Sequence, residues 1–458
     1  MSIETGGGRG RRSPGIAAFL SFLWPGLGQF YAGARRSGFL FAIPVVAVAV
    51  VLVSWLLQGA EAVVVRMFSP DTALTIVVLI ALLAVWRVVS MIDVVSTLGG
   101  RRVWRRPGLS AALATMVVVV VVSHAAAASL AWSFYEAGSK IFTAGTDVDV
   151  TPPPAAASSD NVAVLPVATP VATPVTAQSR INILFLGIDS SERRTHALTD
   201  TLMVVSVDPA TGTAAMISFP RDIADFPLYS GGTYHSKING LMTDAEKHPA
   251  RFPDGGVTTL SKELGFLLGI PIHYYAAINL DGFEAMIDRV GGVTIMNNKA
   301  INDPNYGGWK KPGKIGFHLS AGRHTLDGPN ALAYVRSRLG AGNNDFERAR
   351  RQQQVLVALE KKLSDPAMLP KLSGLLDDAT RTITTSFPPD RLEEMLKIGR
   401  LIDESKINRT VLGPPYARRD MTASDYRLVL VPKKLAALSI ALFGNDSSYA
   451  TATGATTP

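Results

Sequence analysis

The run INILFLGI (181–188) decides the fold of the C-terminal half of this chain, because it has the length and composition of a buried strand. TLMVVSV (201–207) and TAAMISF (213–219) follow it, and the turn sequence DPATG between them predicts a β-hairpin. Residues 257–268 have a helical pattern, 272–280 predict a strand, 281–290 a helix that ends at Gly291 and Gly292, and 293–297 another strand. Strands mixed with helices in this way predict an α/β or α+β sandwich with a mixed sheet.

The N-terminal part of the chain has the composition of a membrane region. Of the 458 residues, 47% are hydrophobic, which is high for a soluble protein. Apolar stretches occupy about 15–33, 37–58, 73–95 and 110–134. The last three approach the roughly 20 residues that a helix needs to cross a bilayer. Pro25, Gly26 and Gly28 interrupt the first stretch, which favours a re-entrant or interfacial segment there.

Basic residues flank these stretches unevenly, and their positions predict a topology. The two clusters are Arg9, Arg11, Arg12, Arg35 and Arg36, and then Arg101, Arg102, Arg105 and Arg106. Lys and Arg favour the cytoplasmic side, so three crossings place both clusters inside and everything after residue 134 outside. We therefore expect a cytoplasmic basic tail (1–14), a multi-pass membrane region (15–134) and an extracytoplasmic C-terminal domain.

Composition also predicts the boundaries of the extracytoplasmic C-terminal domain. Residues 135–179 are rich in Pro, Ala and Thr, which indicates a linker without its own core. The domain then spans 180–444, and a Ser-, Thr- and Ala-rich tail at 445–458 is expected to be disordered. Within the domain, 297–326 is expected to form a long loop.

Several classes of site are poorly supported by the residues. The chain has no cysteine, which excludes disulfides and thiolate chemistry. Its seven histidines lack the spacing of a metal pair, and neither a Gly-x-Ser-x-Gly elbow nor a Walker loop is present. A net charge of +8 leaves open a membrane-tethered regulator that binds nucleic acid. The predicted topology opposes it, so no nucleic-acid partner is expected.

The stretch YVRSRLGAGNNDFERARRQQQ (334–354) concentrates five arginines between apolar runs. Asp345 is expected to cap a helix on which Arg348 and Gln352 share a face, with Arg351 beside them. Arg336 and Arg338 face the same way if their segment is extended. Guanidiniums that converge need an anion between them, and their geometry suits phosphate oxygens. The alternative is a solvated charge run.

A second polar set lies at strand ends. Asp189 follows one predicted strand and Asp200 precedes the next, so adjacent strands would bring both carboxylates to one edge. Such a pair suits Mg²⁺, although two ordinary loop aspartates are the alternative. Arg221 and Asp222 end a third strand in the sequence FPRD, and Lys237 lies in a later loop.

Taken in order, these residues resemble the LytR–CpsA–Psr (LCP) family of bacterial cell-wall ligases. The matching motifs are LFLGID (184–189), TDTLMVVSVDP (199–209), FPRD (219–222), KIN (237–239), GIPIHYYAAINLDGF (269–283), IDRVGGV (287–293), LDGPNALAYVRSR (326–338) and DFERARRQQ (345–353). The resemblance implies a three-layer α/β domain with a central mixed sheet flanked by helices. It also implies an enzyme of the bacterial cell membrane that transfers a glycopolymer from a polyprenyl-pyrophosphate carrier to peptidoglycan.

The resemblance assigns roles residue by residue. Asp189 and Asp200 would hold Mg²⁺; Arg221, Asp222, Arg336, Arg338 and Asp345 would form the catalytic set; Lys237, Arg348, Arg351 and Gln352 would bind the substrate. Two features depart from the family: Leu198 stands where relatives often have arginine, and the N-terminal half has more than one membrane span. A polyprenyl-pyrophosphate hydrolase, an envelope regulator without catalysis and a glycan-binding module stay open as alternatives.

Overall fold

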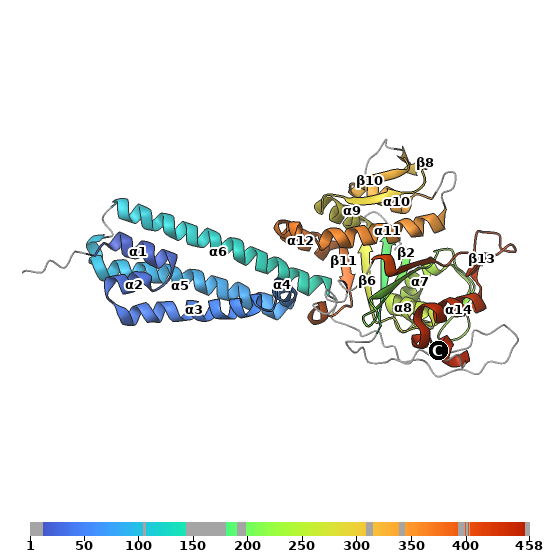
Figure 1. Ribbon diagram of the computed structural model, residues 1–458, viewed down its shortest axis with the longest axis horizontal. Helices are drawn as coiled ribbons and strands as arrows, with labels where there is room; N and C mark the ends of the chain where they lie inside the picture. The colour runs from blue at the N-terminus through green and yellow to red at the C-terminus, as the bar shows by residue number, and fades with distance from the viewer. Residues whose placement is uncertain are drawn as a thin grey trace, which may run out of the picture. The chain divides into compact units, whose positions relative to one another are not determined.

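The computed structural model describes residues 12–103, 107–142, 180–189, 198–307, 315–338, 344–392, 399, 402 and 404–453. The chain divides into two compact units, Met1–Ser139 and Lys140–Pro458, shown in Figure 1. Most of the predicted linker, including 143–179, lies outside the described residues.

In its described residues, the N-terminal unit consists of helices joined by short turns. Its helices are α1 (Pro14–Leu23), α2 (Leu27–Ala32), α3 (Arg35–Leu56), α4 (Ala60–Met67), α5 (Pro70–Val103) and α6 (Pro107–Ile141). Three of them, at Arg35–Leu56, Pro70–Gly99 and Pro107–Ile141, are long and apolar enough to cross a membrane. They overlap the three spans expected from the sequence.

The first apolar stretch forms two short helices, because the backbone turns at Gly26 with φ 99° and α2 begins there. Gly28 lies so close to α1 that an added Cβ would sit 2.1 Å from the carbonyl oxygen of Ala17. The buried Gln29 side chain then donates to the backbone oxygen of Ser90 at 2.8 Å and to Asp93 Oδ2 at 3.1 Å. A glycine contact and a polar cluster therefore hold α1 and α2 against α5, as small and polar residues do between membrane helices.

The C-terminal unit is built on a six-stranded sheet with the order β11–β6–β1–β2–β3–β12. The strands are β1 (Ile181–Asp189), β2 (Leu198–Asp208), β3 (Thr213–Ser218), β6 (Tyr274–Asn279), β11 (Ile383–Thr385) and β12 (Ile407–Val411). β1 runs antiparallel to β2 and parallel to β6, and β3 runs parallel to β12. The sheet is therefore mixed, and the predicted β2–β3 hairpin is confirmed by antiparallel pairing.

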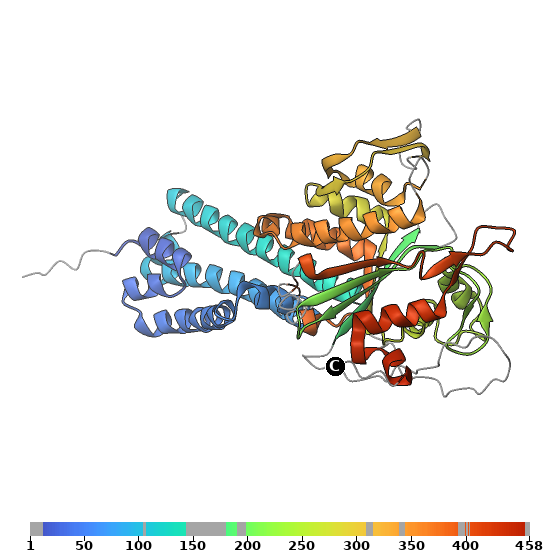
Figure 2. The ribbon, with the colours of Figure 1, turned by 45° about the vertical axis from the view of Figure 1, so that its right-hand side comes forward.

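Helices cover both faces of this sheet, which confirms the three-layer α/β fold (Figures 1 and 2). One layer contains α7 (Leu241–Lys247), α8 (Gly256–Leu268) and α14 (Pro432–Phe443); the other contains α9 (Leu280–Arg289), α10 (Gly328–Arg336), α11 (Asp345–Leu363) and α12 (Leu372–Thr382). Leu184 and Leu202 of the sheet pack in one core with Leu264 of α8. Leu332 of α10 and Val355 of α11 belong to a second core on the opposite side.

Short two-stranded sheets complete the unit. They pair β4 (Phe226–Pro227) with β5 (Thr233–Tyr234), β7 (Val293–Asn297) with β10 (Gly322–Leu326), β8 (Ile301–Gly307) with β9 (Ile315–Leu319), and β13 (Ala417–Arg419) with β14 (Leu428–Leu430). Short 3₁₀ helices occur at Ile238–Gly240 (η1), Pro366–Lys371 (η2), Pro389–Arg391 (η3), Glu404–Lys406 (η4) and Gly444–Asp446 (η5).

The expectation of a long loop at 297–326 is wrong, because three strands lie in it. The glycines and proline of this stretch hid its short alternating runs, yet Ile301 and Phe317 enter the second core and are 8% and 6% exposed. Asn297 fixes the turn before β10 by donating to the backbone oxygen of Ser320 at 2.7 Å.

The expectation of a disordered tail from residue 445 is also wrong as far as Thr453. The chain forms α15 (Ser448–Thr453), and Tyr449 is 2% exposed. Its hydroxyl donates to the backbone oxygen of Leu267 at 3.0 Å, and Ser448 N donates to the oxygen of Gly269 at 2.8 Å. One buried aromatic ring therefore anchors a segment whose other residues are small and polar.

Candidate functional site

Six of the predicted site residues form a continuous group, which we call the charge cluster: Asp200, Arg221, Asp222, Lys237, Asp345 and Arg348. Arg221 Nη1 lies 2.9 Å from Asp200 Oδ1, and Lys237 Nζ lies 2.8 Å from Asp222 Oδ1. Arg348 Nη2 lies 3.3 Å from Asp345 Oδ1. Its Nη2 also lies 3.5 Å from the backbone oxygen of Asp200. Residues from β2, the segment after β3, the start of η1 and the start of α11 thus meet at one place.

The segment after β3 brings two of these residues there. Phe219 N donates to the backbone oxygen of Leu202 at 2.8 Å, which ends the pairing of β3 with β2. The chain then turns, with Ile223 N donating to the oxygen of Pro220 at 3.1 Å, so Arg221 and Asp222 lie within the turn. Ile238 N donates to the oxygen of Ile223 at 2.7 Å, which returns the neighbouring Lys237 to the side of Asp222.

The helix cap differs from the prediction. Asn344, and not Asp345, is the N-cap of α11, and its side chain accepts from Glu347 N at 3.0 Å. A capping residue needs an extended backbone, which Asn344 has with φ −157° and ψ 179°. Asp345 is already in the helix, so its carboxylate is available to face Arg348 and Asp222.

Three consecutive glutamines of α11 each bind a different element. Gln352 Nε2 donates to the backbone oxygen of Val335 at 3.2 Å, so the predicted substrate ligand contacts the end of α10. Gln353, which the sequence did not single out, is 1% exposed and donates to Ser218 Oγ at 2.9 Å and to the backbone oxygen of Thr410 at 3.1 Å. Gln354 Nε2 donates to the oxygen of Met296 at 2.9 Å. These contacts fix the helix that carries Arg348.

Arg336 and Arg338 are expected to face the same way only if their segment is extended, and Arg336 does not meet that condition. Helix α10 runs through Arg336, because Asp327 caps its start and its apolar residues Ala331–Val335 are buried. The chain becomes extended only at Ser337, with ψ 133°. The structure therefore does not place the two arginines on one strand face.

The predicted ligand Arg351 and a residue missed by the sequence hold the segment that carries Arg338. Arg351 Nη2 donates to the backbone oxygen of Ser337 at 2.6 Å, and its guanidinium lies 5.4 Å from the ring centre of Tyr334. Asp303 Oδ2 accepts from Ser337 Oγ at 2.8 Å and from Arg338 N at 3.3 Å. No local pattern marks Asp303, because its partners lie far along the chain.

Burial perturbs the titration of the cluster. It lowers the pKa of Arg348, and it lowers the pKa of Arg351 to about 10. Burial also lowers the pKa of Arg221, but the nearby Asp200, Asp222 and Asp345 outweigh it, so the net shift is upward. The pKa of Asp345 is raised by burial and then by its hydrogen bond with Asp222, against the opposing effect of Arg348. Asp345 therefore keeps its proton to a higher pH than an ordinary aspartic acid does.

Two guanidinium groups of the cluster carry buried hydrogen-bond donors without a partner among the described residues: Arg221 Nε and Arg348 Nε. Asp222 Oδ2 lies 3.9 Å from Arg221 Nε, which is too far for a hydrogen bond. A buried donor without an acceptor costs roughly 1–3 kcal/mol, and more when it is charged. Both donors are consistent with a site that an anion completes.

The backbone brings the predicted magnesium ligands to adjacent strands. Ile188 pairs with Thr199 and Gly187 with Thr201, so the register shifts and Asp200 is the extra residue of a β-bulge. A bulge redirects a side chain, and Asp200 here accepts from Arg221. The side chains of Asp189 and Leu198 lie outside the described residues, as do Arg193 and Arg194. Among the described side chains, no three His, Asp or Glu residues gather to hold a metal, so the Mg²⁺ site stays a prediction.

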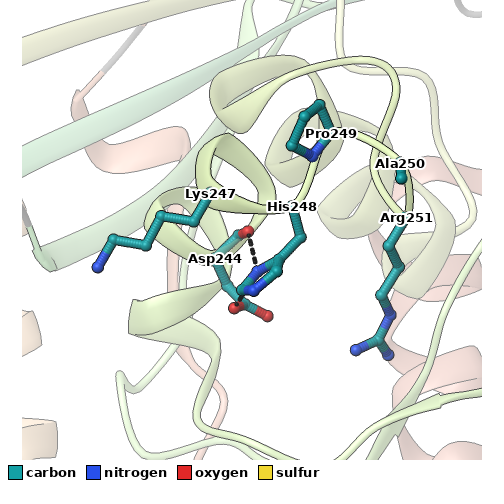
Figure 3. A pocket seen from close by; sticks show the side chains of 6 residues that line it. All are labelled: Asp244, Lys247, His248, Pro249, Ala250 and Arg251. Atoms are coloured by element: carbon teal, nitrogen blue, oxygen red, sulfur yellow. Dashed lines mark hydrogen bonds and ion pairs between the residues drawn. The ribbon is translucent and has the colours of Figure 1, made fainter.

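A separate pocket lies at the end of α7 and along the loop that follows it (Figure 3). Asp244, Lys247, His248, Pro249, Ala250 and Arg251 line it. His248 Nδ1 lies 2.9 Å from Asp244 Oδ1 within the same turn of helix. None of these residues belongs to the charge cluster, so this pocket and the predicted site are distinct.

Comparison with known proteins identifies the family of the chain. The family model described as "LytR_cpsA_psr family" matches residues 154–451. Two relatives are named polyisoprenyl-teichoic acid–peptidoglycan teichoic acid transferase TagU, and each is 30% identical to this chain. The match to the protein of Halalkalibacterium halodurans covers 49% of this chain and 67% of that protein. The match to the protein of Oceanobacillus iheyensis covers 47% of this chain and 62% of that protein. The crystal structure of B. subtilis TagV is 22% identical over 61% of this chain and 99% of that one, with a TM-score of 0.46. Because the family model covers more than half of its residues, the chain belongs to the LytR_cpsA_psr family.

Proposed function

We propose that this protein transfers a glycopolymer from a polyprenyl-diphosphate carrier to peptidoglycan. The relatives in H. halodurans and O. iheyensis are named as transferases of teichoic acid from a polyisoprenyl carrier to peptidoglycan. The observation that carries the proposal to this chain is the pair of buried, unpartnered N–H groups of Arg221 and Arg348. A diphosphate offers the acceptors that these groups require.

The charge balance of the cluster fits such a ligand. Its three basic and three acidic side chains cancel formally. A diphosphate that links a lipid to a sugar carries two negative charges, and Mg²⁺ carries two positive ones. The ion and the diphosphate therefore enter together without adding net charge to a buried site, which keeps the desolvation cost low.

Asp189 and Asp200 are the residues that would hold Mg²⁺, which supplies charge neutralisation on the phosphate oxygens when bound. Arg221 and Arg348 bind the diphosphate and stabilise the charge that grows on the departing polyprenyl phosphate. A sugar hydroxyl of peptidoglycan attacks the phosphorus attached to the glycan, and the bond from that phosphorus to the polyprenyl phosphate breaks. Asp345 accepts the hydroxyl proton, because its raised pKa makes it a stronger base than an ordinary carboxylate.

The same proposal includes an orientation. The asymmetry of the basic clusters supports an orientation with the unit Lys140–Pro458 outside the cytoplasm, where peptidoglycan is. The three long apolar helices support attachment to the membrane lipid in which the donor is embedded. Reporter fusions at residues 60, 104 and 170 test this, with a cytoplasmic signal expected only at 104. A cytoplasmic signal at 170 contradicts the orientation.

Arg348→Met tests the site, with Arg350→Met as its matched control on the same helix. The side chain of Arg348 is 6% exposed and that of Arg350 is 62% exposed. In the full-length chain, assayed in detergent with Mg²⁺, a lipid-diphosphate-linked glycan and peptidoglycan oligomers, Arg348→Met is expected to lose roughly 100-fold or more in transfer rate. Arg350→Met is expected to remain near the wild-type rate. Equal rates for the two variants contradict the assignment.

The fate of the glycan separates transfer from hydrolysis of the carrier. The same cluster serves both reactions, since either nucleophile attacks the same phosphorus. Isotope-labelled glycan is expected on the peptidoglycan oligomers after reaction. Glycan released free in solution, with acceptor present in excess, identifies a hydrolase instead.

A further inference from the structure

The hairpin formed by β13 and β14 is joined directly to the segment that carries Asp222. Leu428 N of β14 donates to the backbone oxygen of Asp222 at 2.9 Å, and Ala224 N donates to the oxygen of Leu428 at 2.9 Å. Ile223 and Leu428 also form a β-bridge. The hairpin therefore cannot move independently of this part of the charge cluster. Its loop projects from the domain in Figure 2 (red).

Side-chain contacts link the hairpin loop to the same cluster. Asp425 Oδ2 lies 3.6 Å from Lys237 Nζ, whose other partner is Asp222 at 2.8 Å. Arg427 Nε lies 2.6 Å from Asp425 Oδ1, and Arg427 Nη1 donates to the backbone oxygen of His235 at 3.0 Å. These contacts hold the loop on the solvent side of Lys237 and Asp222.

Tyr426 lies on this loop and presents its ring to solvent. It is 41% exposed, and among the described residues of Lys140–Pro458 it is the only Phe, Trp or Tyr that is exposed. The guanidinium of Arg419 lies 5.4 Å from its ring centre. Its neighbour Asp425 contacts Lys237 of the charge cluster, and Leu428, two residues further on, donates to the backbone oxygen of Asp222, so Tyr426 lies at the edge of the cluster.

We propose that Tyr426, Arg419 and Asp425 form the subsite for the acceptor glycan. Transfer requires a sugar ring beside the reacting diphosphate, and this hairpin borders the charge cluster on its exposed side. An aromatic face packs against the C–H face of a pyranose, while the neighbouring guanidinium and carboxylate bind hydroxyl and acetamido groups. The inference rests on the proposed function and adds to it the place where peptidoglycan binds.

A lipid surface is the other partner that an exposed ring on a basic hairpin fits, since Met421 at the loop is 80% exposed and Arg418 is also exposed. The contacts of Asp425 with Lys237 and of Leu428 with Asp222 favour the glycan, because they hold the loop of Tyr426 at the border of the charge cluster. Binding to a membrane does not require that proximity.

Steady-state kinetics of the full-length chain in detergent, with acceptor concentration varied, test the subsite. Tyr426→Ala is expected to raise the KM for peptidoglycan oligomers roughly 5- to 10-fold, with kcat and the KM for the lipid-linked donor changed less than about twofold. Tyr426→Phe keeps the ring and is expected to restore the acceptor KM. Met421→Ala, the matched control on the same loop, is expected to match wild type. An unchanged acceptor KM for Tyr426→Ala overturns the inference.

A direct binding measurement tests the acceptor subsite without requiring that the protein catalyse transfer. Calorimetric titration of the same chain with un-crosslinked peptidoglycan oligomers, without donor, is expected to show weaker binding for Tyr426→Ala by the same factor. If wild type transfers no glycan, the proposed function fails, and this titration still decides the subsite. Equal binding by wild type and variant overturns it, as does a variant that loses only its affinity for anionic lipid vesicles.

Discussion

Glu263 of α8 gives the prediction whose size follows most directly from the structure. It is fully buried, and burial raises its pKa to about 8 from the ordinary 4.5. Oε2 accepts from Tyr229 N at 3.2 Å, whereas Oε1 has no hydrogen-bond partner among the described residues. The carboxyl group is therefore mainly protonated at pH 7 in the folded protein and ionised in the unfolded chain.

The sign and size of the effect follow from this difference. The folded pKa lies above the unfolded one, so the folded state binds the extra proton and stability falls as pH rises from about 4.5 to about 8. At about 1.4 kcal/mol per pH unit, the loss reaches about 3 kcal/mol at pH 7 and about 5 kcal/mol above pH 8. Glu263→Gln imitates the protonated side chain and removes this dependence.

Hydrogen exchange of peptides covering α8, in full-length chain held in detergent, measures the effect locally. The variant is expected to match wild type at pH 5 and to exceed its local stability by several kcal/mol at pH 8.5. Other titrating groups cancel, because both proteins contain them. A difference between the proteins that stays constant from pH 5 to 8.5 refutes the reasoning.

Two further substitutions test how the fold supports the site. Gln353→Ala removes hydrogen bonds to Ser218 Oγ at 2.9 Å and to the backbone oxygen of Thr410 at 3.1 Å, and it leaves a cavity. Chemical denaturation is therefore expected to show a free energy of unfolding lower by about 2–4 kcal/mol. The rate of glycan transfer is expected to fall as well. Gly28→Ala places a methyl group 2.1 Å from the backbone oxygen of Ala17, so α1 and α2 can no longer pack as closely. Protease cleavage between α1 and α2 is therefore expected to accelerate. As a control, amide hydrogens in peptides of the Lys140–Pro458 unit are expected to exchange at wild-type rates.

The elements that the sequence predicts correctly are those determined by local pattern. The β2–β3 hairpin follows from two apolar runs and a turn, and α8 follows from helical spacing, so neither depends on a distant part of the chain. The expected loop at 297–326 fails for the opposite reason, because its strands are short and contain glycine and proline. The tail fails because one residue, Tyr449, anchors it to α8.

The residues of the candidate site also fall into those that local sequence predicts and those that it does not. Charge type and motif order identify the residues of the charge cluster, and their contacts confirm that they meet. The supporting residues Gln353 and Asp303 cannot be predicted from local sequence, because their partners are distant in the chain. Thr410 lies 57 positions from Gln353, and Ser337 lies 34 positions from Asp303. The choice between Asn344 and Asp345 as helix cap also depends on the local backbone, since both residue types cap helices well.

The central claim is that a diphosphate binds between Arg221 and Arg348. A crystal structure of the full-length chain with a short-chain polyprenyl diphosphate and Mg²⁺ tests it most directly. We expect phosphate oxygens within about 3 Å of Arg221 Nε and Arg348 Nε, the two buried donors that lack a partner among the described residues. A diphosphate bound elsewhere, for example against Lys247 and Arg251 in the pocket of Figure 3, contradicts the claim.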